Sequence, residues 1–181
     1  FSIMIALSPS AQAWSEFVHS EICEQAYQRL SPQAKRLVLK LTTGEHQLEG
    51  DSSFGHACVW ADEVRHTSHK ATYEYHFINT PRELDINLAR DCAAHDCVNQ
   101  AVKRYAIYLS DQNRRPSQRA EALRFLGHFV ADLHQPLHVG NKEDRGGNDI
   151  HVFWQQEPET QRLHGLWDGT IPRAMGLLDD A

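Results

Sequence analysis

Apolar residues recur at intervals of three and four along most of the chain, which predicts helices as its main elements. The first such run extends from Phe17 to Leu30. Ser31 and Pro32 then provide an N-cap and a first-turn proline for a second helix that reaches about Leu41.

The same periodicity predicts three further helices, and alternation of apolar and polar positions predicts a little extended structure. The helices are expected over residues 57–70, 83–110 and 118–135, after a polar, glycine-bearing loop over 43–55. Residues 75–81 ("YHFINTP") look extended, and residues 149–154 ("DIHVFW") and 161–168 ("QRLHGLWD") should pair. The expected fold class is mainly α, a single helical domain with one small β-hairpin.

The charge balance bears on the kind of substrate that the chain can bind. The formal net charge is −6 over 181 residues, so the chain lacks the excess of lysine and arginine with which proteins usually bind a polyphosphate backbone. A phosphate substrate would need another source of positive charge. Twelve histidines indicate that source, because imidazole is a common ligand of divalent zinc.

The first thirteen residues are an apolar run, a turn and the sequence Ala11-Gln12-Ala13, which has the small-x-small form of a signal-peptidase site. A short buried helix is the alternative. Cleavage after Ala13 would leave Trp14 as the mature N-terminus and implies a secreted or periplasmic protein, in a compartment where cysteines can pair. We therefore expect a signal-peptide remnant over 1–13 and one domain over 14–181, truncated at its C-terminus. No other apolar run approaches the length of a transmembrane span, so no stable membrane association is expected.

The stretch "HFVADLHQPLH" brings three histidines and an aspartate to the end of a predicted helix. His128 and Asp132 stand four residues apart, so they share one helix face and can meet one cation. Pro136 ends the helix, and His138 beyond it can serve a second, adjacent metal. His134 points away from the line of His128 and Asp132, so we do not expect it to be a ligand.

A histidine and an aspartate four residues apart are more often a surface ion pair than a ligand set. Here the spacing recurs in "LHGLWD", and further candidates lie in "WADEVR", in "YHFIN" and beside the predicted mature N-terminus, whose freed amine would be a nitrogen ligand. The set exceeds what one tetrahedral zinc needs. Its members are Trp14, His19, Asp62, His76, His128, Asp132, His138, His164 and Asp168.

In combination these motifs resemble the zinc-dependent single-strand-specific nucleases and 3′-nucleotidases, the S1/P1 nuclease family. The resemblance runs from Trp14 to Asp168 and includes "WADEVR", "HFIN", "HFVADLHQPLHVG", "DRGGN" and "LHGLWD". It implies a monomer with a phospholipase C or single-strand nuclease-like fold and a trinuclear zinc site in a cleft. One ion would take Asp62, His76, His128 and Asp132, a second His138, His164 and Asp168, and a third the amine and carbonyl of Trp14, His19 and again Asp132.

The resemblance also implies the reaction. Single-stranded DNA or RNA and 3′-nucleotides would be hydrolysed to 5′-phosphorylated products by attack of a zinc-bridging hydroxide, with Asp132 and Arg65 as catalytic residues. Arg65 would contact the phosphate, although a simple salt bridge is the alternative. Phe77 would stack on the base, or else belong to the core. Asn79 stands where fungal members usually have an aspartate, and Asn148 would orient Asp132 or the phosphate.

The four cysteines fit the same family. Cys92 and Cys97 match its short-loop disulfide, and Cys23 and Cys58 match a bridge of the plant-type members. Four buried free thiols are the alternative.

Two rival functions stay open at this point. A zinc phospholipase C shares the trinuclear design, but the five-residue spacing from Trp14 to His19 and a final ligand Asp168 in place of glutamate argue against it. A non-catalytic exported zinc-binding protein, or an inactive fragment, is the other.

Overall fold

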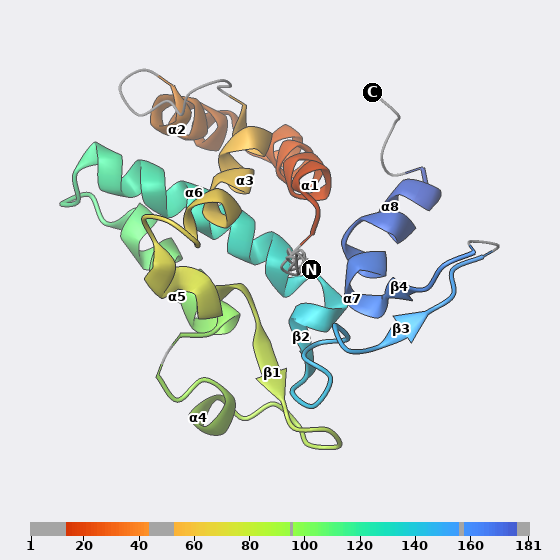
Figure 1. The fold of residues 1–181 in the computed structure, drawn as a ribbon. Coiled ribbons are helices and arrows are strands. Elements are labelled where there is room, and N and C mark those ends of the chain that lie inside the picture. Colours follow the sequence, from red (N-terminus) through yellow and green to blue (C-terminus); the bar gives the residue numbers. More distant parts are fainter. Residues whose placement is uncertain (1–13, 44–52, 95, 156–157, 177–181) are drawn as a thin grey trace, which may run out of the picture.

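The computed structural model describes residues 14–43, 53–94, 96–155 and 158–176. The expected signal-peptide remnant and the last five residues lie outside the described residues. The fold is mainly helical, as predicted, with short strand pairs (Figure 1). Over the described residues, no helix combines the length and the apolar character needed to cross a membrane.

Three N-terminal helices begin at serines that act as N-caps. These helices are α1 (Glu16–Arg29), α2 (Pro32–Thr42) and α3 (Phe54–Val64). The side-chain oxygens of Ser15, Ser31 and Ser53 each accept a backbone N–H from three residues further on, which satisfies donors that the first helical turn leaves free. The first two helices match the sequence prediction.

The longest helix, α6 (Pro116–Leu133), packs against α5 (Val98–Ser110) and against α1, α2 and α3 (Figure 1). Its core-facing residues include Phe125 and Phe129, which are fully buried and stacked with their ring centroids 5.4 Å apart. Tyr105 of α5 stacks on Phe125 at 4.6 Å. Because α6 also carries His128 and Asp132, this core fixes the position of the candidate site.

Two predicted helices are wrong in their extent. The helix expected over 57–70 ends at Val64, and after turns the chain forms a 3-10 helix, η2 (Lys70–His76). The helix expected over 83–110 is divided into α4 (Leu88–Asp91) and α5. The Cys92–Cys97 disulfide closes a tight loop between them, and the Asn87 side chain caps α4 from within the predicted helix.

The strands form two separate pairs. β1 (Ile78–Thr80) lies parallel to β2 (Val139–Asn141), a pairing that the sequence did not predict. Strand β2 directly follows the short 3-10 helix η3 (Pro136–His138). The predicted hairpin is present as β3 (His151–Val152) and β4 (Gln161–Arg162) in antiparallel register, but it is shorter than expected.

Beyond Arg162 the chain is helical, so the prediction of an extended strand through 168 is wrong. Here α7 (Leu163–Gly165), the π-helical turn η4 (Leu166–Thr170) and α8 (Ile171–Ala174) follow one another. The helical conformation places His164 and Asp168 one turn apart on the same side. A strand would also have placed both side chains on one face, but with their Cα atoms further apart.

Candidate metal centre

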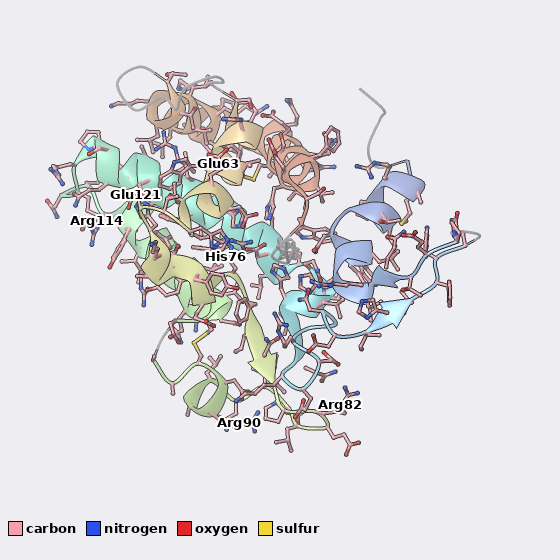
Figure 2. All side chains as sticks on the ribbon, in the orientation of Figure 1. Glu63, His76, Arg82, Arg90, Arg114 and Glu121 are labelled. Atoms are coloured by element: carbon pink, nitrogen blue, oxygen red, sulfur yellow. A yellow bond between two sulfur atoms is a disulfide. The ribbon has the colours of Figure 1, made fainter. Side chains whose placement is uncertain are left out.

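Eight histidine and aspartate side chains from seven segments converge beside the C-terminal half of α6. His76 is labelled in the middle of the molecule in Figure 2. All but Asp62 are buried, with exposed fractions between 0% and 7%. They come from α1 (His19), α3 (Asp62), η2 (His76), α6 (His128 and Asp132), η3 (His138), α7 (His164) and η4 (Asp168).

The first group contains the four residues expected around one ion. Asp132 Oδ2 lies 3.0 Å from His76 Nδ1 and 3.1 Å from His128 Nε2. Asp62 Oδ1 lies 3.5 Å from His76 Nδ1 and 3.6 Å from His128 Nε2. Two imidazole nitrogens and two carboxylates thus surround one point, which is a donor set that zinc accepts.

His19 approaches the same carboxylates from the side of α1. Its Nε2 lies 3.3 Å from Asp132 Oδ1 and 4.0 Å from Asp62 Oδ2, and its ring stacks on that of His128 at 3.9 Å. His19, Asp62 and His128 also form a compact group of possible ligand atoms. Asp132 therefore faces His19 with one oxygen and His76 with the other.

His138, His164 and Asp168 form a separate compact group. His164 Nε2 lies 3.5 Å from Asp168 Oδ2, and the rings of His138 and His164 are stacked 5.1 Å apart. His138 Nδ1 also lies 3.4 Å from Asp132 Oδ1. The two halves of the cluster consequently meet at Asp132.

Trp14 is held next to this cluster. Its indole Nε1 donates a hydrogen bond of 2.9 Å to the carbonyl oxygen of Ala131, the residue before Asp132. The backbone N–H of Ser15 donates to the carbonyl oxygen of Asp168 at 2.8 Å. These bonds fix the chain at Trp14 between α6 and η4, beside the groups that carry His19 and Asp132.

Three of the histidines are anchored by backbone carbonyl groups. The Nδ1 atoms of His128, His138 and His164 lie 2.6–2.8 Å from the carbonyl oxygens of Cys58, His76 and Gly146, respectively. A carbonyl oxygen only accepts, so each Nδ1 carries a proton, and each Nε2 is the ring nitrogen that can bind a metal ion. Anchored imidazoles of this kind are typical of metal-ligating histidines.

Several atoms of the cluster lack the hydrogen bonds that buried polar groups normally make. Among them are His19 Nδ1 and His76 Nε2, both of which are buried without a hydrogen-bond partner. Such atoms are costly to bury unless a further group satisfies them. Their number, together with the nitrogen and oxygen donors around them, fits the binding of divalent metal ions.

Burial and the charges of neighbouring side chains shift the pKa values of the cluster. Burial would raise the pKa of Asp132, but the positive charge of His128 and the hydrogen bonds from His128 and His19 outweigh it and hold the pKa well below its usual value. Burial would lower the pKa of His128, but the carboxylates of Asp132 and Asp62 raise it to about 9. Burial lowers the pKa of His138 to about 4 and raises that of Asp168 to about 8. Metal binding would therefore release protons from His128 and Asp168.

A cavity of about 330 Å³ opens onto the cluster, with His76, His138 and His164 in its lining. Arg65, Phe77, Asn79 and Asn148 line the same cavity, so the structure brings the four expected substrate-contacting residues to one place. The sequence left a phosphate contact and a salt bridge as alternatives for Arg65. Its Nη1 forms a 2.9 Å ion pair with Asp62 Oδ1, and its position in the cavity lining is compatible with a phosphate contact as well. Phe77 is half-buried, and Asn148 Nδ2 donates to the Arg145 carbonyl oxygen at 2.9 Å.

Gln135 is a residue that the sequence did not single out. It is fully buried, and its Nε2 donates a 2.7 Å hydrogen bond to Asp168 Oδ1. This bond holds one candidate ligand of the second group in place. His134, by contrast, is exposed, and its Nδ1 contacts the Val130 carbonyl oxygen, one turn back on the same helix.

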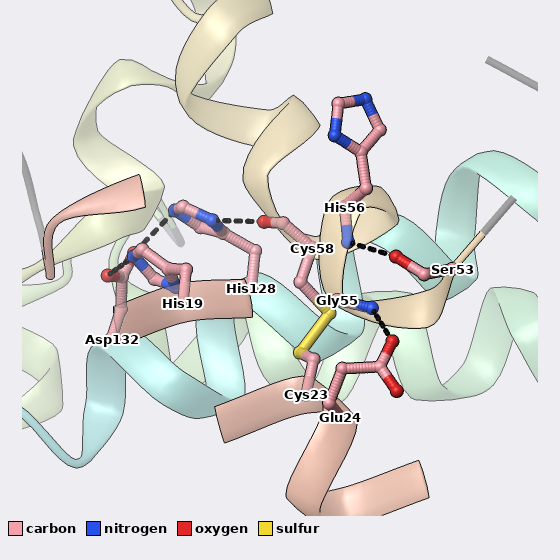
Figure 3. Close-up of a disulfide and its surroundings, with 9 residues drawn as sticks. All are labelled: His19, Cys23, Glu24, Ser53, Gly55, His56, Cys58, His128 and Asp132. Atoms are coloured by element: carbon pink, nitrogen blue, oxygen red, sulfur yellow. Dashed lines mark hydrogen bonds and ion pairs between the residues drawn. A yellow bond between two sulfur atoms is a disulfide. The ribbon is translucent and has the colours of Figure 1, made fainter. Parts of the chain in front are cut away.

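Both expected disulfides are present. Cys92 pairs with Cys97, and Cys23 pairs with Cys58. The second bridge joins α1 to α3, and beside it Glu24 Oε1 accepts the backbone N–H of Gly55 at 2.8 Å (Figure 3). The bridge therefore links the helix of His19 to the helix of Asp62.

Comparison with known proteins identifies relatives of the chain. The family model described as S1/P1 Nuclease matches residues 14–178. The chain is 34% identical to Endonuclease 2 of Arabidopsis thaliana over 178 residues, which cover 93% of this chain and 59% of that protein. It is 32% identical to Nuclease P1 of Penicillium citrinum over 167 residues, which cover 90% of this chain and 59% of that protein. The chain thus spans about three fifths of the length of these relatives. It belongs to the S1/P1 nuclease family.

Proposed function

We propose that the protein is a zinc-dependent phosphodiesterase that hydrolyses single-stranded DNA or RNA and 3′-nucleotides to 5′-phosphorylated products. The observation that supports this most is the position of Asp132, whose two carboxylate oxygens face different histidines of one buried cluster at the base of a cavity. Membership of a family with members named as nucleases and endonucleases supports the same reaction class.

The cluster offers enough ligands for three Zn²⁺ ions. Asp62, His76, His128 and Asp132 would hold the first, and His138, His164 and Asp168 the second. A third would take His19, Asp132 and the amine and carbonyl of Trp14, so that removal of the preceding residues would be a condition of activity. Bound zinc would supply positive charge for the phosphate, an activated water and stabilisation of the leaving oxygen.

The side chains of the cavity would bind and orient the substrate. Arg65 would bind a phosphate oxygen, and its ion pair with Asp62 at the edge of the cavity supports this role because it restricts the motion of the guanidinium. The low pKa of Asp132 keeps that carboxylate ionised, as a metal ligand must be. Gln135 holds Asp168 by a hydrogen bond, which keeps that carboxylate oriented toward His164.

Phe77 would provide the face on which a nucleobase stacks, and stacking tolerates any base. Asn79 lines the same cavity with a buried Oδ1 that has no hydrogen-bond partner. An amide both donates and accepts, so Asn79 would contact the edge of the base without selecting strongly among bases. Asn148 would contact the phosphate from the opposite loop.

The two disulfides support a secreted or periplasmic location, because such bridges persist in oxidising compartments. We propose that the protein acts as a monomer with nucleic acid as its macromolecular substrate.

Metal content measured beside hydrolysis of three substrates tests the proposal. The substrates are single-stranded DNA, a 3′-nucleoside monophosphate and phosphatidylcholine. Three zinc ions per chain with release of 5′-phosphorylated products and no lipid turnover would support the proposed function. Lipid turnover would indicate a phospholipase C instead, and bound zinc without hydrolysis of any substrate would indicate a non-catalytic zinc-binding protein.

A further inference from the structure

Tyr73 lies on the wall of the cavity that opens onto the metal cluster. It lines this cavity together with Arg65, His76 and Phe77. Its side chain is 41% exposed, which leaves much of the ring open to a ligand.

The 3-10 helix η2 explains how the sequence "TYEYH" sends its two tyrosines in different directions. In a 3-10 helix, side chains three residues apart eclipse one another, so Tyr73 lies on the same side of η2 as the candidate ligand His76. Tyr75 lies on another side and packs edge-on against the core residue Phe129, at 6.3 Å between ring centroids. Packing of the core accounts for Tyr75, whereas Tyr73 is directed to the cavity.

The neighbours of Tyr73 include the two side chains proposed to bind a nucleotide, and its ring centroid also lies 5.7 Å from that of His66. Its ring centroid is 6.3 Å from that of Phe77, with the two planes at 87°. The guanidinium carbon of Arg65 lies 5.9 Å from the Tyr73 ring centroid. Tyr73 is therefore adjacent both to the ring that would stack on a base and to the group that would bind the phosphate.

The angle between the rings determines what Tyr73 can bind. A base stacked flat on Phe77 is nearly perpendicular to Tyr73, so one base cannot stack on both rings. A phosphate beside Arg65 carries a nucleoside on each side when it belongs to an internal linkage of a strand, but only one nucleoside when it belongs to a 3′-nucleotide. The second ring is consequently available to a second nucleoside.

We propose that Tyr73 is a second stacking residue of the cavity, which binds the base of the nucleotide adjacent to the one stacked on Phe77. This inference rests on the proposed nuclease function. With Tyr73 in this role, the protein should prefer strands to single nucleotides, which have no second base. It should also prefer unpaired strands to duplexes, because bases that are paired and stacked in a duplex do not expose their faces to a side chain.

Tyr73→Ala tests the proposal by its dependence on substrate length. Loss of one stacked base is expected to reduce kcat/KM on a short single-stranded oligonucleotide by about 5-fold to about 150-fold, mainly through KM. Hydrolysis of a 3′-nucleoside monophosphate should change less than about 2-fold, since that substrate has no second base. Tyr73→Phe, which keeps the ring, should retain oligonucleotide activity.

Phe153→Ala is the matched control. Phe153 directly follows β3, is 72% exposed and is not part of the cavity lining. Its removal should change the hydrolysis of neither substrate. Equal losses on both substrates in Tyr73→Ala would overturn the proposal, because they would mean that the ring only supports Arg65 or the fold. Unchanged oligonucleotide kinetics would overturn it as well.

A binding measurement separates this proposal from the proposed function. Fluorescence anisotropy with a labelled phosphorothioate oligothymidine reports affinity without hydrolysis. If the unmodified protein cleaves nothing, the nuclease proposal fails, and the binding assay still decides on Tyr73. Weaker binding by Tyr73→Ala, with unchanged binding by Phe153→Ala, supports a stacking role for Tyr73. Equal binding by the unmodified protein, Tyr73→Ala and Phe153→Ala contradicts it.

Discussion

The Nδ1 atom of His128 lies 2.7 Å from the carbonyl oxygen of Cys58, and this contact connects a disulfide to the candidate metal centre (Figure 3). Cys58 is bonded to Cys23, which lies one turn beyond His19 in α1. Cys58 itself lies one turn before Asp62 in α3. One covalent bridge thus restrains the backbone that supports three candidate ligands.

Removal of this bridge should weaken metal binding as well as the fold. The bridge spans 35 residues of sequence, and a loop of that length corresponds to about 3–4 kcal/mol of stability in the chain-entropy model. The double variant Cys23→Ala/Cys58→Ala should also bind zinc about 10-fold more weakly, as expected when the support of a ligand is lost. Competition with a chromophoric chelator measures the affinity, and chemical denaturation in EDTA measures the stability.

The short bridge provides the control for that experiment. Cys92→Ala/Cys97→Ala removes a disulfide from the loop before α5, which connects no two elements that carry candidate ligands. This variant should lose stability but keep its zinc affinity. Unchanged zinc affinity in the Cys23 and Cys58 double variant would show that the disulfide does not support the cluster.

Gly127→Ala should be strongly destabilising, although alanine is a better helix former than glycine. A Cβ atom at Gly127 would lie 2.5 Å from Cys58 Sγ and 3.1 Å from the Phe54 ring. The helix or the disulfide must then shift, at a cost of about 1–3 kcal/mol, and the shift is transmitted to His128 next to it. Thermal unfolding with and without zinc measures both effects. A gain in stability would contradict this packing.

Gln135→Met should reduce metal affinity while keeping the fold. Methionine approximates the shape of glutamine but cannot donate the 2.7 Å hydrogen bond to Asp168 Oδ1. Loss of such a supporting bond typically lowers metal affinity about 10- to 100-fold. Zinc titration followed by calorimetry would detect the loss, with near-normal circular dichroism as evidence that the variant is folded. Full affinity would mean that Asp168 needs no support from Gln135.

The sequence was most informative where local spacing and chain order determine the outcome. The helix face shared by His128 and Asp132, the turn at Pro136 and the Ser31 cap depend on neighbouring residues, and the structure has them as predicted. The ligand groups themselves required the family resemblance, because His19, Asp62 and His76 are brought to α6 by tertiary packing that no spacing reveals.

Other features depend on contacts distant in sequence and were missed. The helix predicted over 83–110 is interrupted because the Cys92–Cys97 loop overrides a favourable apolar pattern. The parallel pairing of β1 with β2 joins segments about sixty residues apart, so neither strand signals the other. Gln135 preceded a proline and gave no sign that its side chain would hold Asp168.

The central claim is that Asp132 is shared by two zinc ions of the proposed centre, the one bound by His76 and His128 and the one bound by His19. Its carboxylate lies 3.0–3.4 Å from His19, His76, His128 and His138. Asp132→Asn should therefore lose more than one ligand contact, whereas His134→Gln, two residues further on and exposed, should leave the centre intact.

The most direct test is the number of zinc ions per chain in Asp132→Asn, determined by mass spectrometry of metals beside hydrolysis of single-stranded DNA. The account predicts three ions in the unmodified protein and in His134→Gln. In Asp132→Asn it predicts fewer ions and a loss of activity greater than the roughly 10- to 100-fold that removal of a supporting residue causes. Three zinc ions and a near-normal rate in Asp132→Asn would contradict it.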